Sequence, residues 1–76
     1  MKLFDELETR RAKEQLIAEV FAQQLGISRA TYYAMKDGRR RPSDKFRTSV
    51  IQRYPELAPI VLDNVVEYAA LSEAIA

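Results

Sequence analysis

The residues with the clearest chemical potential lie in one short segment, GISRATYYAMKDGRRRPS, which covers residues 26–43. This segment combines two adjacent tyrosines with a run of three arginines. Guanidinium groups bind phosphate oxygens and can form paired hydrogen bonds with the O6 and N7 atoms of guanine. Aromatic rings and hydroxyls can contact bases and phosphates beside them. These side chains, placed together, indicate contact with a polyanion.

The charge is divided unevenly along the chain, although the formal net charge is only +1. Residues 1–53 contain all twelve Lys and Arg and have a net charge of +5, whereas residues 54–76 contain four acidic residues and no basic ones. Residues 28–53 alone carry eight basic and two acidic residues. Such asymmetry suggests that one half meets a polyanion and the other has a different role. A solvated basic surface would account equally well for the charge alone.

The chain contains no Cys and no His, which restricts its chemistry. Disulfides, thiolate or imidazole metal sites and Ser-His or Cys-His nucleophiles are excluded, and a reducing compartment is expected. No pair of carboxylates lies on an otherwise apolar face, so we expect no enzymatic activity, cofactor, metal or small-molecule substrate. No apolar run approaches the roughly 20 residues of a membrane span, and the N-terminal sequence MKLFDELE is too acidic for a signal peptide. A cytoplasmic protein without membrane association is expected.

A small helical domain must position these side chains. A chain of 76 residues suits one domain, 1–76, with one modest core, and only two Gly and three Pro interrupt it. Ser28 is suited to an N-cap, Ser43 or Pro42 can open the fourth helix, and Gly26 and Gly38 are suited to helix ends. In the fourth helix, Phe46, Val50 and Ile51 are expected to face inward. The apolar spacing predicts an all-α compact bundle of four to five helices, at about 2–14, 17–24, 28–37, 43–53 and 59–75.

The spacing within residues 18–38 matches a helix-turn-helix. That motif needs a small residue at its fifth position, where two helices cross, and Gly at its ninth, where the turn favours a positive φ. Counted from Ala18, these are Ala22 and Gly26. The apolar residues required at five further positions are Phe21, Leu25, Ile27, Tyr32 and Met35. All seven requirements are met.

On these residues, QLIAEVFAQQLGISRATYYAMKDGRRRPS resembles the DNA-binding domain of the lambda-repressor/Cro-like helix-turn-helix family. The resemblance covers about residues 3–54 and is most specific over 21–43. It implies that the third helix enters the DNA major groove and that the first two helices are separated by a break near Gln15–Leu16. The sequence departs from the family at Ala18, which cannot bond a phosphate, and at Val20, where a polar residue is usual.

The helix-turn-helix divides the third helix into two faces. Tyr32 and Met35 are expected inside, and the other side is expected to face DNA. The alternatives are that Arg29 is merely solvated, that Ala30 and Ala34 are only good helix formers, and that Tyr33 packs on arginine stems. Base-edge contacts are predicted for Arg29, Ala30, Tyr33, Ala34 and Arg40. Contacts with the DNA backbone are predicted for Ser28, Thr31, Lys36, Arg39 and Arg41.

The C-terminal segment 59–75 is apolar over far more than the roughly 100° stripe that a surface helix needs. One side can enter the domain core, and the remaining side is expected to form a homodimer. Two-fold dimers contact palindromic half-sites about 34 Å apart. Dimer contacts are predicted for Val61, Leu62, Val65, Val66, Tyr68 and Ala69.

These inferences favour a sequence-specific, double-stranded-DNA-binding transcriptional regulator. The most economical form is a small repressor of phage, plasmid or mobile-element type, bound as a homodimer to a palindromic operator in the nucleoid of a prokaryotic or phage-infected cell. Two alternatives stand beside it. One is an excisionase-like architectural DNA-binding protein, although many of these use a winged fold and no hairpin is predicted here. The other is a protein-binding adaptor or antitoxin that uses the C-terminal helix.

Overall fold

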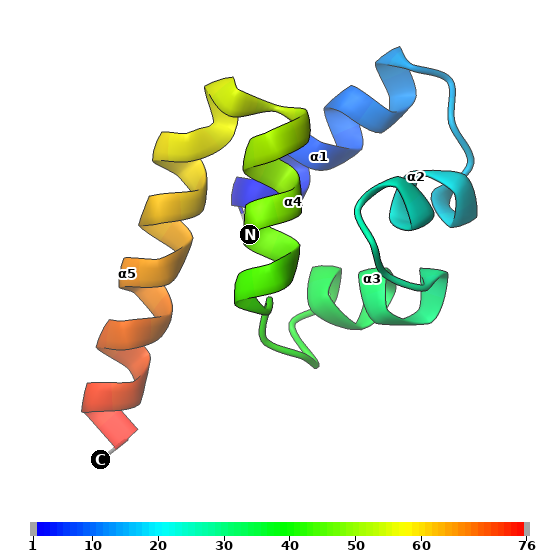
Figure 1. Ribbon diagram of the computed structural model, residues 1–76. Helices are drawn as coiled ribbons and strands as arrows, with labels where there is room; N and C mark the ends of the chain where they lie inside the picture. The colour runs from blue at the N-terminus through cyan, green and yellow to red at the C-terminus, as the bar shows by residue number, and fades with distance from the viewer. Residues whose placement is uncertain (1, 76) are drawn as a thin grey trace.

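The computed structural model describes the backbone of residues 2–75 and the side chains of residues 2–66. A 3-10 turn, η1 (Pro55–Leu57), precedes the last helix, and the described residues contain no strand. The predicted all-α bundle is therefore confirmed. Figure 1 shows the last helix beside the fourth, with its C-terminal end extending beyond the other helices. The helices are α1 (Lys2–Lys13), α2 (Ala18–Gln24), α3 (Arg29–Lys36), α4 (Asp44–Arg53) and α5 (Ala58–Ile75).

Aromatic side chains from four helices meet at the centre of the core. Phe4 of α1 stacks on Phe46 of α4, with ring centroids 5.8 Å apart and planes 7° apart. Tyr32 of α3 meets Phe4 edge-on at 5.7 Å and Phe21 of α2 edge-on at 5.8 Å. Such pairs contribute about 0.5–1.5 kcal/mol beyond the burial of their surface. The core is completed by Leu3, Leu7, Ala22, Leu25, Met35, Val50, Leu57 and Val61.

Both predicted serine caps are present. The Ser28 Oγ accepts a hydrogen bond from the backbone N–H of Thr31 at 3.1 Å, and the Ser43 Oγ accepts one from the N–H of Phe46 at 3.2 Å. Each bond satisfies a backbone donor that has no partner within its own helix, which is typically worth about 1 kcal/mol. The starts of α3 and α4 are thus defined by the two serines.

α2 and α3 end in left-handed glycine turns, as the sequence predicts. Gly26 has φ 77° and Gly38 has φ 81°. Past the first of these turns, the N–H of Ile27 donates to the carbonyl of Ala22 at 3.0 Å, and an equivalent backward bond follows Gly38. These bonds satisfy carbonyls at the helix end and stop the helix within one residue. Only residues 25–28 separate α2 from α3.

α1 ends in the same kind of turn without a glycine. Gln15 has φ 57° and is the one non-glycine residue with positive φ in the described chain. The N–H of Leu16 donates back to the carbonyl of Arg11 at 3.2 Å, and the Arg11 Nη1 donates to the carbonyl of Leu16 at 3.1 Å. The predicted break near Gln15–Leu16 is confirmed, and this turn is its physical cause.

A buried polar contact attaches α5 to α4. Arg47 and Asn64 are 7% and 2% exposed, and the Arg47 Nε and Nη2 donate to the Asn64 Oδ1 at 3.2 and 3.1 Å. The Arg47 Nη1 donates to the Asp44 Oδ1 at 3.2 Å. Because a buried charge is costly unless it is hydrogen-bonded, this contact favours one rotation of α5 against α4.

Two expectations from the sequence about α4 and α5 are wrong. Val61, assigned above to a dimer surface, is 2% exposed and belongs to the core. Ile51, expected inside, is 37% exposed. The reason is that Val61 shares the side of α5 that carries Asn64 toward α4, whereas Ile51 follows Val50 by one residue and so lies about 100° around the helix from it. Tyr68 and Ala69 lie outside the described side chains.

The turn at Gln15 leads to a stability prediction. Replacing Gln15 with Gly should raise the free energy of unfolding by about 0.5–1 kcal/mol, because a left-handed conformation costs a side-chain-bearing residue roughly 1–2 kcal/mol and the freer unfolded state of Gly offsets part of the gain. Chemical denaturation measures the change. Gln23→Gly, at an exposed position inside α2, is the matched control and should lower stability by about 0.5–1 kcal/mol. Equal destabilisation by both changes would contradict the prediction.

Candidate nucleic-acid interface

The exposed face of α3 begins at its first turn. Ser28, Arg29 and Ala30 are exposed, whereas Tyr32 and Met35 are 0% and 1% exposed. Within the part of the chain whose side chains are described, that of Arg29 has no hydrogen bond or ion pair. The predicted division of α3 into an inner and an outer face is therefore present, with a guanidinium near the start of the outer face.

Ser28 and Thr31 are bound to each other at the start of α3. Besides capping the helix, the Ser28 hydroxyl donates to the Thr31 Oγ1 at 2.9 Å. Ser28 is exposed and Thr31 is half-buried. The pair orders the first turn of α3, and the Thr31 hydroxyl can still donate a hydrogen bond outward. Both residues thus have a structural role at the place where the sequence predicted backbone contacts.

The arginines of residues 39–41 lie directly against the end of α3. The backbone N–H groups of Arg39 and Arg40 both donate to the carbonyl of Ala34, at 2.8 and 3.1 Å. All three arginine side chains are exposed, and the chain then turns inward at Pro42, which is fully buried. The structure therefore brings the arginine segment and the exposed face of α3 together.

The arginine side chains differ in their partners. The Arg39 Nη2 lies 3.2 Å from the Asp37 Oδ2, with both side chains more than half exposed, so this ion pair is weak and easily exchanged. Arg41 has an interaction within the protein. Within residues 2–66, the Arg40 side chain has no hydrogen bond or ion pair. Arg40 is thus the most available of the three.

Lys36 contacts a neighbouring helix, and Tyr33 packs against side chains of its own helix. Tyr33 is 36% exposed, and its ring lies edge-on to Tyr32 at 5.8 Å. The Lys36 Nζ lies 5.6 Å from the centre of the Tyr33 ring and 3.6 Å from the Glu8 Oε1 of α1. Lys36, predicted to contact phosphate, is therefore paired with α1, and the small side chain of Ala34 is half-buried.

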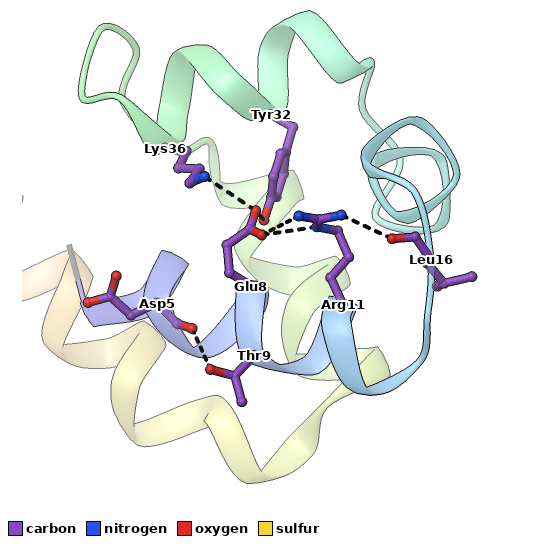
Figure 2. Close-up of polar contacts among 7 residues, drawn as sticks. All are labelled: Asp5, Glu8, Thr9, Arg11, Leu16, Tyr32 and Lys36. Carbon is purple, nitrogen blue, oxygen red and sulfur yellow. Dashed lines mark hydrogen bonds and ion pairs between the residues drawn. The ribbon is translucent and has the colours of Figure 1, made fainter.

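A polar cluster around Glu8 connects α1 to α3 and to the loop before α2, as Figure 2 shows. The Tyr32 hydroxyl donates to the Glu8 Oε1 at 2.9 Å, and the Arg11 Nη2 and Nε donate to the Glu8 Oε2 at 2.6 and 3.0 Å. Arg11 also donates to the carbonyl of Leu16, just before α2. The cluster therefore fixes α3 and the entrance of α2 relative to α1.

Sequence reasoning missed this cluster. The available signal was a tyrosine assigned to the core, because a buried Tyr hydroxyl needs a hydrogen-bond partner. Glu8 and Arg11, three residues apart on one helix, were suitable candidates.

The charges in the cluster are set by its hydrogen bonds. Burial raises the pKa of Glu8, but hydrogen bonds from Arg11 and Tyr32 and the charges of Arg11 and Lys36 outweigh it, so the pKa lies below its ordinary value. Burial, and then the hydrogen bond to Glu8, raise the pKa of Tyr32 far above its ordinary value. At neutral pH, Glu8 is therefore ionised and the Tyr32 hydroxyl is protonated.

Other arginines of the basic half are used inside the fold. Arg10 lies 3.4 Å from Glu56, and its guanidinium lies 5.3 Å from the centre of the Tyr54 ring. The Arg53 Nη2 donates to the Glu14 Oε1 at 2.6 Å. These arginines, like Arg47, are thus bound to partners within the fold. Exposed lysines remain on α1 and α4, at Lys2, Lys13 and Lys45.

The described part of the chain lacks two further classes of site. It contains no group of three or more acidic side chains that could hold a metal ion. It also contains no helix that is both long and apolar enough to cross a membrane.

Searches against models of known protein families, curated proteins and solved structures found no match to this chain.

The Glu8 cluster predicts an acid-sensitive contribution to stability. Glu8→Gln should lower the free energy of unfolding at pH 7 by about 1.5–3 kcal/mol, the size expected for hydrogen bonds to a charged group. Because the folded-state pKa of Glu8 is lowered, its contribution is present above the unfolded-state pKa of about 4.3 and is lost as pH falls through the folded-state value. Denaturation of parent and variant at several pH values measures the difference.

Glu6→Gln is the matched control, because it removes the same charge from the same helix at a residue without a polar side-chain contact to α3 in the described structure. We expect it to change stability by less than about 0.5 kcal/mol. A difference between parent and Glu8→Gln that stays constant from neutral pH to pH 3 would show that the ionised carboxylate is not the source of the stability.

Proposed function

We propose that this chain is a sequence-specific, double-stranded-DNA-binding transcriptional regulator of the lambda-repressor/Cro-like type, acting as a small repressor. The observation that carries the proposal is the placement of two exposed guanidiniums, both unpaired among the described side chains, at the start of α3 and just beyond its end. These are Arg29 and Arg40, respectively. An α-helix with its side chains is about 10–12 Å in diameter, and the major groove, about 12 Å wide, admits one helix.

In this proposal Arg29 and Arg40 contact different parts of the DNA. Arg29 lies on the first turn of α3 and forms paired hydrogen bonds with a guanine edge, while Ala30 is small enough for close approach to a thymine methyl group. The arginine segment 39–41 neutralises phosphates, and Arg40 also reaches a base edge. Each phosphate contact releases condensed counterions, so affinity falls steeply with salt. The repressor acts by occupying an operator and excluding RNA polymerase.

The structure also bears on the two alternative functions, the excisionase-like protein and the adaptor or antitoxin. Residues 2–75 contain no strand, so the winged form that many excisionase-like proteins use is absent from them. An adaptor or antitoxin would need no exposed guanidiniums along α3, but it would use the apolar side of α5. DNA binding at low salt by the purified protein separates the repressor from an adaptor that binds only protein.

We also propose that the repressor is a homodimer formed through the outer side of α5. Leu62 and Val66 are 63% and 62% exposed, and Val65 and Ile51 are 37% exposed. Such side chains are costly to leave in water on a small protein and are typical of an interaction surface. Residues 54–76 carry no basic side chain, so this surface has no electrostatic attraction for phosphates. Two-fold pairing would present two copies of α3 to a palindromic operator.

The DNA-binding proposal predicts a change in sequence preference. From a pool of random duplexes, the parent should select one defined sequence, and Arg29→Ala and Tyr33→Ala should each lose preference at some of its positions, at a cost of about 1–3 kcal/mol per base contact. Sequencing of the bound DNA gives the result. Lys13→Ala, which removes an exposed cation from α1, should select the parental sequence. Selection of one identical sequence by the parent and both α3 variants would refute the assignment of α3.

The dimer proposal predicts a change in molecular mass. At tens of micromolar, sedimentation of the parent should show a dimer, and Val66→Glu should shift it to the monomer because two carboxylates would be brought into an apolar interface. Ile17→Glu is the matched control, since Ile17 is 65% exposed at the N-terminal boundary of α2, and it should remain dimeric. A monomeric parent would rule out dimerisation through α5 in the free protein.

A further inference from the structure

Tyr33 is held in place on two sides. Its ring lies edge-on to Tyr32, with centroids 5.8 Å apart and planes 74° apart, and the Lys36 ammonium lies 5.6 Å from its centre. An edge-to-face aromatic pair is worth about 0.5–1.5 kcal/mol, and a cation over an aromatic ring at an exposed site is worth about 0.5–1 kcal/mol. A ring that is 36% exposed is therefore restrained by its neighbours and is not free to sample every rotamer.

Both neighbours of the Tyr33 ring are bound by the same carboxylate oxygen. The Glu8 Oε1 accepts the hydrogen bond of the Tyr32 hydroxyl at 2.9 Å and lies 3.6 Å from the Lys36 Nζ. The other oxygen of Glu8 is held by Arg11, whose Nη2 lies 2.6 Å away. Without Glu8, the Lys36 side chain would lose the charge that draws it toward α1 and over the ring.

We infer that Glu8 is a positioning residue for base contact: through Lys36 and Tyr32, it holds the Tyr33 ring in the orientation that contacts DNA. This inference rests on the proposed function. Glu8 lies on α1 and its side chain is 22% exposed, so the role we assign to it acts through its neighbours. The role of Lys36 is then to hold Tyr33, and the phosphate contacts fall to the arginine segment. A residue outside the helix-turn-helix thereby affects which DNA sequence is preferred.

The experiment is a double-mutant cycle on sequence discrimination. The probes are the duplex that the parent selects from the random pool and a scrambled duplex of the same composition, and the measured quantity is the ratio of their dissociation constants. Glu8→Gln and Lys36→Met should each lower this ratio about fivefold, the lower end of what one base contact contributes. In a Tyr33→Ala background, neither change should lower it further. The ratio is insensitive to general loss of charge, which weakens binding to both duplexes.

A measurement without DNA tests the physical basis. In the free protein, Glu8→Gln and Lys36→Met should each shift the NMR resonances of the Tyr33 ring protons. Glu6→Gln and Lys13→Met, which remove the same charges from α1 at exposed or half-exposed positions, should shift neither these resonances nor the ratio. Lys36→Met also covers the case in which Glu8→Gln unfolds the protein, because the Lys36 side chain is 37% exposed and can be replaced without opening the core.

The outcomes separate this inference from the proposed function. A parent that binds both duplexes equally refutes the proposed function and the role of Glu8 with it. If the parent discriminates, but Glu8→Gln lowers the ratio equally with and without the Tyr33→Ala change, the positioning role alone is refuted. Tyr33 resonances that are unchanged in Lys36→Met also refute it.

Discussion

One carboxylate, that of Glu8, joins α1 to α3 and, through Arg11, to the segment before α2. It accepts hydrogen bonds from Tyr32 on α3 and Arg11 on α1, and Arg11 continues to the carbonyl that precedes α2. A partly buried carboxylate stabilises the fold only while both of its oxygens accept hydrogen bonds. Loss of one partner from the cluster would therefore destabilise the folded state. The Tyr32 hydroxyl is under the same constraint, because its ring lies at the centre of the core. The packing of the Tyr32 ring and the hydrogen bond of its hydroxyl therefore require the same position of α3.

That placement leaves arginines exposed at both ends of α3, namely Arg29 and the arginine segment 39–41. Arg10, Arg11, Arg47 and Arg53 form ion pairs elsewhere in the fold. The left-handed turn at Gly38 and the two bonds to the Ala34 carbonyl keep that segment against the helix. The proposed DNA contact depends on this geometry more than on the net charge, which is only +1.

α5 contributes a second exposed surface, which is apolar, whereas that of α3 is basic. Its inner side reaches the core through Val61 and is bound to α4 by Asn64 and the buried Arg47, while Leu62 and Val66 are left in water. A buried Arg-to-amide contact is directional, unlike apolar packing, so it selects one rotation of a helix that is apolar on most sides. In the proposed homodimeric repressor, the rotation of α5 determines which of its side chains face the second subunit.

Local patterns in the sequence determined the helices, the serine caps at Ser28 and Ser43 and the glycine turns, because caps, turns and apolar periodicity act over a few residues. They also determined which side of α3 is exposed. The break at Gln15 was inferred only from the family resemblance, because no Gly or Pro marks it. Only the tertiary structure decided that Glu8 binds a tyrosine 24 residues away, that Lys36 turns toward α1, and that Val61 is inside while Ile51 is outside. A charged or apolar side chain is equally compatible with several partners until packing brings one of them within bonding distance.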